Sequence, residues 1–336
     1  MNQRPPLGST PDFDPIQQEL LGALRQSSDY ISGETLAARL GASRTAVWKR
    51  LQRLRAAGYQ IVGSPRRGYR LEAHPDLLLP AEIARDLDTK FLRGPFYHFF
   101  NLSSTNDLAK QLARQGYPEG TVILAESQTA GRGRLGRNWE SPPGSGIYVS
   151  IILRPALPPV EMPKLTLTAA VAVVQALEQT TGIRVGIKWP NDLIWQEKKL
   201  GGILTEMETE SDQMSHLVLG LGVNVNTSSF PPALATIATS LAQGGGRFSR
   251  LAILRAWLEA LDRLYGRFQA REFAPILARW RQAAVSLGKT VTVRQGSGTI
   301  TGLALDVTPE GALLIQTAVG EIRQVICGEI DPGPLG

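Results

Sequence analysis

The pattern of hydrophobic and polar positions near the N-terminus predicts three helices followed by a β-hairpin. The third helix, "RTAVWKRLQRLRAA", follows the capping residue Ser43 and places Val47, Leu51 and Leu54 on one buried stripe. The hairpin "YQIVGSPRRGYRL" comes next and turns at residues 65–68. Helices and a hairpin in this order predict a winged helix-turn-helix domain.

The outer face of this third helix is rich in hydrogen-bond donors. Residues 43–70 hold eight Lys or Arg and no acidic residue, which favours a polyanionic partner for this segment. We therefore expect the domain to bind operator DNA, although a solvated basic face on a small helical domain remains the alternative. The expected DNA-binding residues are Arg44, Thr45, Trp48, Lys49, Gln52, Arg66 and Arg67.

Helices and strands alternate over the middle of the chain without a regular βαβ repeat. Helices are predicted over "SSTNDLAKQLARQ" and "KLTLTAAVAVVQALEQT". Strands are predicted over "TVILAES", "GIYVSIILR", "VGIKW", "KLGGILTEME" and "SHLVLGLGVNVN", and the last two resemble an antiparallel hairpin. This pattern predicts an α+β domain with a mixed sheet and helices mostly on one side.

Short strands with glycine turns replace the helical pattern after Ala284, which predicts a small SH3-like β-barrel. A second break lies at residues 72–83, where two prolines bracket a non-periodic stretch. We therefore expect an α+β multidomain protein with domains at residues 1–75, 80–283 and 284–336, of which residues 1–15 form a flexible tail.

The composition is that of an ordinary globular protein, with 336 residues, 43% of them hydrophobic, and a net charge of +6. The N-terminus lacks the apolar core of a secretory signal, and the run "LTLTAAVAVVQAL" is short for a membrane span. The one cysteine, Cys327, excludes an intramolecular disulfide and is expected to be buried. We expect a soluble cytoplasmic protein with no membrane partner and, because its histidines are scattered, no metal site.

The stretch "GRGRLGRNWESP" contains Gly131-x-Gly133-x-x-Gly136, which matches the dinucleotide-binding fingerprint. A Rossmann loop must open a helix, but the following "RNWESPPGSG" holds two prolines and two glycines. A disordered arginine–glycine segment does not fit either, because the motif occurs once and between two strands. We therefore expect an anion-binding loop, with a solvated basic loop as the alternative. Its arginines are Arg132, Arg134 and Arg137.

Other segments add candidate binding residues. Lys188 projects from the side of its strand opposite the apolar residues, where it could bind phosphate or carboxylate or simply be a surface lysine. Gly220, Gly222 and Asn224 share one face of a strand and leave room for a flat ligand. The polar groups of residues 103–106 could hold a carbonyl oxygen, cap a helix, or do both.

These motifs occur in the order seen in biotin–protein ligases: "STN" at 104–106, Gln128, "GRGRLGR" at 131–137, "KWPNDL" at 188–193, "KLGGIL" at 199–204 and "GVNVN" at 222–226. With the winged helix, residues from about Gln18 to Ile330 resemble the bifunctional bacterial ligases, which are also biotin operon repressors. The resemblance implies a class II synthetase-like catalytic domain. It also implies that biotin and Mg-ATP are the substrates, with biotinoyl-5′-AMP as the intermediate and no tightly bound prosthetic group. The implied acceptor is a lysine of biotin carboxyl carrier protein. The resemblance further implies that the protein is a homodimer when liganded.

The resemblance also assigns residues. Ser104, Thr105, Asn106 and Gln128 would surround the biotin ureido ring. The catalytic set would be Lys188, which bridges the biotin carboxylate and the α-phosphate, with Arg132 and Arg134. The remaining substrate-binding residues would be Gly131, Gly133, Gly202 and Asn224. Leu135 stands where some members have another arginine. A lipoate-type acyl ligase and a biotin-sensing repressor without catalysis are the alternative functions.

Overall fold

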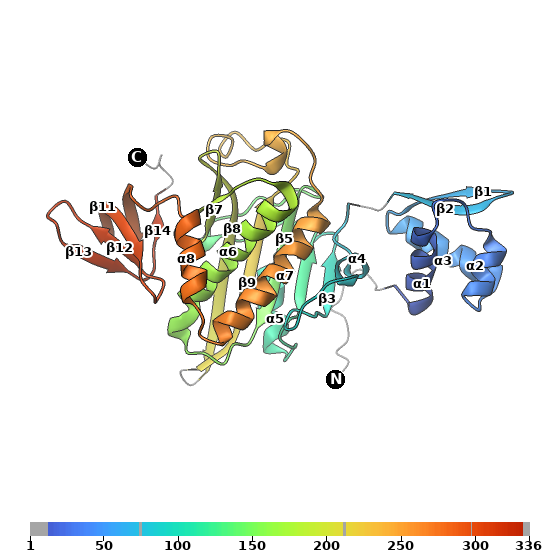
Figure 1. Cartoon of the computed structure of the whole chain (residues 1–336), viewed down its shortest axis with the longest axis horizontal. Coiled ribbons are helices and arrows are strands. Elements are labelled where there is room, and N and C mark those ends of the chain that lie inside the picture. Colours follow the sequence, from blue (N-terminus) through green and yellow to red (C-terminus); the bar gives the residue numbers. More distant parts are fainter. Residues whose placement is uncertain (1–12, 74–75, 211–212, 297, 332–336) are drawn as a thin grey trace. The chain divides into compact units, whose positions relative to one another are not determined.

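The computed structural model describes residues 13–73, 76–210, 213–296 and 298–331, which lie in two compact units, Thr10–Arg85 and Asp86–Gly336 (Figure 1). The expected division into three domains stays a prediction. Residues 80–84, expected at the start of the second domain, belong to the first unit, and the C-terminal strands belong to the second. The expected tail lies mainly outside the described residues, but Asp14 caps the first helix and Pro15 begins it.

The first unit holds the helix-turn-helix and its hairpin. The elements are α1 (Pro15–Gln26), α2 (Gly33–Arg39), α3 (Arg44–Ala56), β1 (Gln60–Ser64), β2 (Gly68–Ala73) and α4 (Pro80–Ala84). The Ser43 side chain accepts a hydrogen bond from Ala46 N, so the predicted cap of α3 is confirmed. Val47, Leu51 and Leu54 are all buried in the core of this unit, as the helical spacing predicts.

A seven-stranded mixed sheet forms the centre of the second unit. Its strands are β3 (Phe96–Phe99), β4 (Val122–Ala125), β5 (Gly146–Leu153), β6 (Gly186–Lys188), β7 (Asp192–Trp195), β8 (Lys198–Glu210) and β9 (Gln213–Asn224), in the order β3-β4-β5-β9-β8-β7-β6. Among the strand pairs that the structure describes in this sheet, β3 and β4 alone are parallel, and β8 and β9 form the predicted antiparallel hairpin. The sequence pattern missed β3 and β7, whose four residues are too few to establish a period.

Helices cover both faces of this sheet. Figure 1 shows α6 (Met162–Thr181) and α7 (Arg250–Gln269) running across one face. On the same face α8 (Ala274–Ala283) packs against α6. On the other face, α5 (Thr105–Arg114) packs against Ile123, Ile152 and Val218. By length and composition the segment Pro159–Thr181 could cross a membrane, contrary to the expectation that its apolar run is too short. Its burial against α7 and the sheet is that of a core helix.

The C-terminal part is a five-stranded antiparallel sheet. Its strands are β10 (Thr290–Gln295), β11 (Gly298–Val307), β12 (Leu313–Gln316), β13 (Ile322–Val325) and β14 (Glu329–Ile330), in the order β13-β12-β11-β10-β14. Within residues 286–331, apart from residue 297, no pairing joins β13 to β14, so the sheet is open and the SH3-like barrel stays a prediction. Cys327 is exposed in the bend between these two strands, and the expectation of a buried thiol is wrong.

Candidate functional site

The N-terminus of α5 brings together the predicted polar residues. Ser104 caps the helix by accepting a 3.3 Å hydrogen bond from Asp107 N. Thr105 N donates to Gln128 Oε1 at 2.8 Å, and Ser150 Oγ on β5 donates to Thr105 Oγ1 and to Asn106 Oδ1. Since these side chains come from a helix, a loop and a strand, their contacts require the folded sheet.

Side chains from neighbouring segments pack directly against the glycines of β9. A Cβ at Gly220 would lie 2.1 Å from Asn106 Oδ1, and one at Gly222 would lie 2.6 Å from the Trp139 indole. A Cβ at Gly220 would force the Asn106 side chain to move, and one at Gly222 would force the Trp139 ring to move, which accounts for the glycines. Asn106 and Trp139 therefore cover part of the floor that the sequence pattern left to a ligand.

A cavity opens above this floor, and most of the predicted site residues line it. Those that do so are Ser104, Thr105, Asn106, Gln128, Arg132, Gly133, Arg134, Gly202 and Asn224. Lys188 and Gly131 are absent from its lining. Gly131 instead packs against the far arm of its own loop, where a Cβ would lie 2.4 Å from Trp139 O.

The loop at residues 131–139 folds back on itself. Gly133 N donates to Arg137 O at 2.7 Å, and Trp139 N donates to Gly131 O at 2.8 Å. Between these bonds the chain makes one 3₁₀ turn, in which Leu135 has a φ of 54° and an exposed side chain. The next element is the strand β5, so no helix N-terminus follows the glycines and the loop is not a Rossmann loop.

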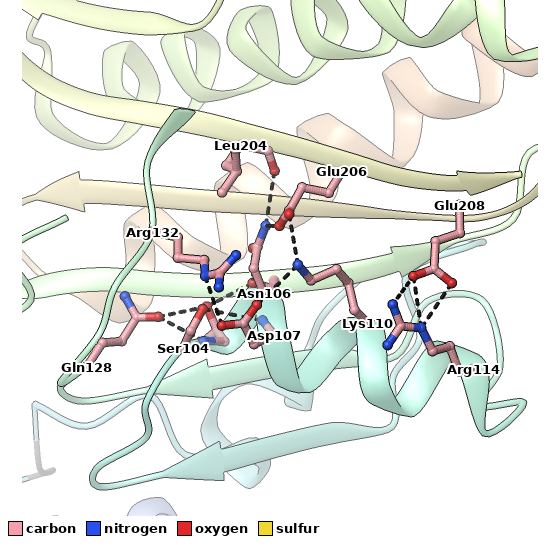
Figure 2. A network of polar contacts seen from close by, with 12 residues as sticks. Ser104, Asn106, Asp107, Lys110, Arg114, Gln128, Arg132, Leu204, Glu206 and Glu208 are labelled. Atoms are coloured by element: carbon pink, nitrogen blue, oxygen red, sulfur yellow. Dashed lines mark hydrogen bonds and ion pairs between the residues drawn. The ribbon is translucent and has the colours of Figure 1, made fainter. Parts of the chain in front are cut away.

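Each arginine of the loop has a polar partner. Arg132 Nε lies 3.0 Å from Asp107 Oδ2 on α5, as Figure 2 shows. Arg134 Nη1 donates to Asn191 Oδ1 at 3.0 Å, and burial lowers the pKa of Arg134. Arg137 forms an ion pair with Glu329 in the C-terminal sheet. The loop therefore presents fixed cations on one side of the cavity.

A lysine that the sequence reasoning did not single out lies in the cavity. Lys199, within "KLGGIL", lines it, with Nζ 2.7 Å from Asp192 Oδ1 and 5.8 Å from the centre of the Trp139 ring. Lys188 pairs across the sheet with Asp192, which pairs with Gly202, so the three residues share a face. Lys188 is only 9% exposed, and burial lowers its pKa. Lys188 thus lies at the end of a cross-strand row formed by Lys188, Asp192 and Gly202, and of these three residues it alone does not line the cavity.

The structure adds apolar residues and a buried ion pair that no motif predicted. The apolar lining comes from the segment after β9 and consists of Phe230, Leu234, Ile237 and Ala238. Arg250, which is fully buried, donates to Glu126 Oε2 at 2.8 Å and to Gly146 O at 3.1 Å. Because Glu126 and Gly146 lie at the two ends of the segment that carries the arginine loop, Arg250 fixes the base of that segment.

The predicted DNA-binding face lies on the surface of the first unit. Arg44, Thr45, Trp48 and Lys49 are exposed on α3, and Gln52 is half-buried. On the hairpin tip, Arg66 and Arg67 are exposed. Arg67 is also 2.5 Å from Asp29, and its guanidinium lies 4.4 Å from the centre of the Tyr30 ring.

Comparison with known proteins finds matching families along the described chain. Residues 99–224 match the biotin/lipoate A/B protein ligase family, residues 16–70 an HTH domain, and residues 286–332 the biotin protein ligase C-terminal domain. The bifunctional ligase/repressor BirA of Bacillus subtilis (strain 168) is 40% identical over 95% of this chain and 99% of its own. Its Escherichia coli (strain K12) counterpart is 31% identical over 92% of this chain and 94% of its own. The structure of biotin protein ligase from Aquifex aeolicus in complex with biotin and ATP is similar, with a TM-score of 0.61 and 32% identity over 70% of this chain and 97% of that chain.

Proposed function

This chain belongs to the family of bifunctional biotin ligases and repressors, and on that premise we propose how its residues divide the two activities. The protein is an ATP-dependent biotin–[acetyl-CoA-carboxylase] ligase with a DNA-binding repressor domain. It activates biotin to biotinoyl-5′-AMP with release of pyrophosphate. The amine of an acceptor lysine, on biotin carboxyl carrier protein, then attacks the acyl carbon and AMP leaves.

The observation that carries this assignment is the cavity at the N-terminus of α5, which is lined both by cations (Arg132, Arg134 and Lys199) and by neutral polar groups (Thr105, Asn106 and Gln128). In the first step a carboxylate oxygen attacks the α-phosphorus, which brings two anions together. Fixed cations neutralise both anions without forming a covalent bond to either. Arg132, Arg134 and Lys199 are suitably placed, because all three line the cavity.

The neutral polar groups suit the ureido ring of biotin. Thr105, Asn106 and Gln128 are held by hydrogen bonds to one another or to Ser150, so their donors and acceptors are oriented before the ligand binds. Gly202 and Asn224 line the same cavity farther along β8 and β9. We assign these last two residues to the adenylate.

The two lysines have different parts in this proposal. Lys199 contacts the biotin carboxylate and the α-phosphate directly. Lys188, at the end of the Asp192–Gly202 row, adds positive potential from behind Asp192, a change from the bridging role that the family resemblance implies. The arginine loop closes over the adenylate and excludes water from the mixed anhydride.

We propose domains at residues 1–75, 80–283 and 284–336, with closure of the C-terminal sheet as an SH3-like barrel. Mg²⁺ enters with ATP as part of the substrate. The liganded protein is a homodimer that works in the cytoplasm.

A biotin-transfer assay tests the ligase function. Purified protein with biotin, Mg-ATP and a carrier domain is expected to biotinylate one lysine of the carrier. Binding of lipoate but not biotin in calorimetry would instead identify a lipoate ligase. Tight biotin binding without transfer would leave a repressor that lacks catalysis.

A gel-shift experiment tests the repressor function separately. Operator DNA is expected to bind more tightly when biotin and ATP are both present, because the adenylate favours the DNA-binding homodimer. A shift that does not respond to biotin and ATP would contradict this coupling.

A further inference from the structure

A chain of alternating charges connects the arginine loop to the floor of the cavity (Figure 2). Arg132 Nε lies 3.0 Å from Asp107 Oδ2, and Lys110 Nζ lies 3.1 Å from Asp107 Oδ1. Lys110 Nζ is also 2.8 Å from Glu206 Oε1 on β8. Glu206 Oε2 in turn accepts a 2.9 Å hydrogen bond from Asn106 Nδ2. Both oxygens of each carboxylate therefore have a partner.

We propose that Asp107 is a positioning residue that holds Arg132 ready at the cavity before any anionic substrate arrives. This inference rests on the ligase function proposed above. Lys110 and Glu206 fix the Asp107 carboxylate, and Asp107 fixes the guanidinium.

The geometry leaves Arg132 able to act on substrate while it is held. Its contact with Asp107 uses Nε, so the two terminal amino groups can donate as a fork to carboxylate or phosphate oxygens. Arg132 is 53% exposed on a glycine-flanked loop, where an unheld arginine would sample many rotamers. A side chain ordered in advance loses less conformational entropy when the ligand binds.

A second ion pair offers a matched control. One turn farther along α5, Arg114 pairs with Glu208, two residues beyond Glu206 on β8 (Figure 2). It joins the same helix to the same strand, but neither residue lines the cavity. If Asp107 served only to stabilise the helix or the sheet, loss of the Asp107 charge and loss of the Glu208 charge would have similar effects.

Steady-state kinetics of the full-length protein test the proposal. Asp107→Asn is expected to raise the KM for biotin or ATP about three- to tenfold with kcat within about twofold, whereas Glu208→Gln leaves both unchanged. In the Arg132→Ala background, Asp107→Asn is expected to have no further effect, because it acts through the absent guanidinium. An unchanged or lowered KM in Asp107→Asn, or additive effects in the double variant, would overturn the proposal.

Amide hydrogen exchange of the ligand-free protein tests the link without catalysis. The amides of Gly133 and Trp139, which are hydrogen-bonded across the loop, are expected to exchange faster in Asp107→Asn but not in Glu208→Gln. Equal exchange in the two variants would refute the link. If Asp107→Asn does not fold, Arg132→Gln removes the same contact from the side of the loop. The same faster exchange of the loop amides is then expected in Arg132→Gln. A wild-type protein that fails to transfer biotin would refute the proposed function, and the exchange result would still decide the link.

Discussion

Lys199 Nζ lies 2.7 Å from Asp192 Oδ1 inside the cavity, while Lys188, the neighbour of Asp192 across β6 and β7, lies outside the cavity lining. Asp192 therefore separates two lysines, one of which can reach a ligand. Asp192 pairs with the Lys199 ammonium, and the Trp139 ring lies near the same ammonium. The Lys199 ammonium therefore has a defined position before a substrate anion binds.

Removal of the Lys199 charge is expected to impair adenylation most. Lys199→Met should lower kcat for biotin-dependent pyrophosphate release about 100-fold, because the cation meets charge that develops between carboxylate and phosphate. The measurement is pyrophosphate release with biotin and ATP in the absence of carrier. Lys198→Met, at the adjacent position, is the control. A Lys199→Met enzyme with wild-type kcat would show that the arginines alone neutralise the anions.

Lys188 is expected to lower stability while it supports activity. Burial lowers its pKa, so the folded protein binds this proton more weakly than the unfolded chain. The resulting loss of folding stability is complete at pH values below the pKa of Lys188 in the folded state. It disappears as the pH rises to the ordinary pKa of lysine. Lys188→Met should therefore raise the free energy of unfolding by about 1 kcal/mol at pH 7, with a gain that shrinks in alkaline solution.

Urea unfolding from pH 7 into alkaline solution measures the free energy of unfolding of the wild type and of Lys188→Met. Lys90→Met, at an exposed lysine, is the control. Transfer activity of the same variant should fall, because the positive potential behind Asp192 is lost. If Lys188→Met were less stable than the wild type, the favourable interactions of the Lys188 ammonium with its neighbours would outweigh the cost of its burial.

The sequence predicted the elements that rest on long patterns or strong local signals. Ser43 and the stripe of Val47, Leu51 and Leu54 identified α3, because capping and helical spacing are local properties. The glycine-rich loop was also correctly separated from a Rossmann loop, since the prolines after it exclude a helix.

What the sequence did not predict depends on contacts between distant segments. Lys199 enters the cavity because β7, a four-residue strand, pairs with β8 and brings Asp192 beside it. Phe230 and Leu234 lie in a segment without helix or strand periodicity, so nothing marks them as lining residues. The partner of Arg250 is 124 residues away in sequence, and such a pair carries no local signal.

A methyl group at Gly222 is expected to disturb the cavity floor. The new Cβ would lie 2.6 Å from the Trp139 indole, so Gly222→Ala must displace that ring and the loop arm that carries it. The KM for biotin should rise about tenfold, since small changes in a packed binding pocket cost this much. Kinetics together with tryptophan fluorescence measure the change. Gly298→Ala, whose nearest atom would be 3.7 Å away, should change neither quantity, and an unaffected Gly222→Ala would place Trp139 elsewhere in solution.

Lys49 on α3 and Arg67 at the hairpin tip are expected to differ in their contributions to DNA binding. Arg67 is held by Asp29 and Tyr30, so it must leave a protein partner to bind phosphate, whereas Lys49 has an exposed side chain on α3. Lys49→Ala should reduce the slope of log K against log salt concentration by about 1, as loss of one phosphate contact does. Arg67→Ala should change the slope less, and Arg184→Ala, in the ligase unit, not at all. Titration of operator DNA at several salt concentrations measures these slopes, and an equal loss for Lys49→Ala and Arg67→Ala would show that Asp29 releases Arg67 on the DNA.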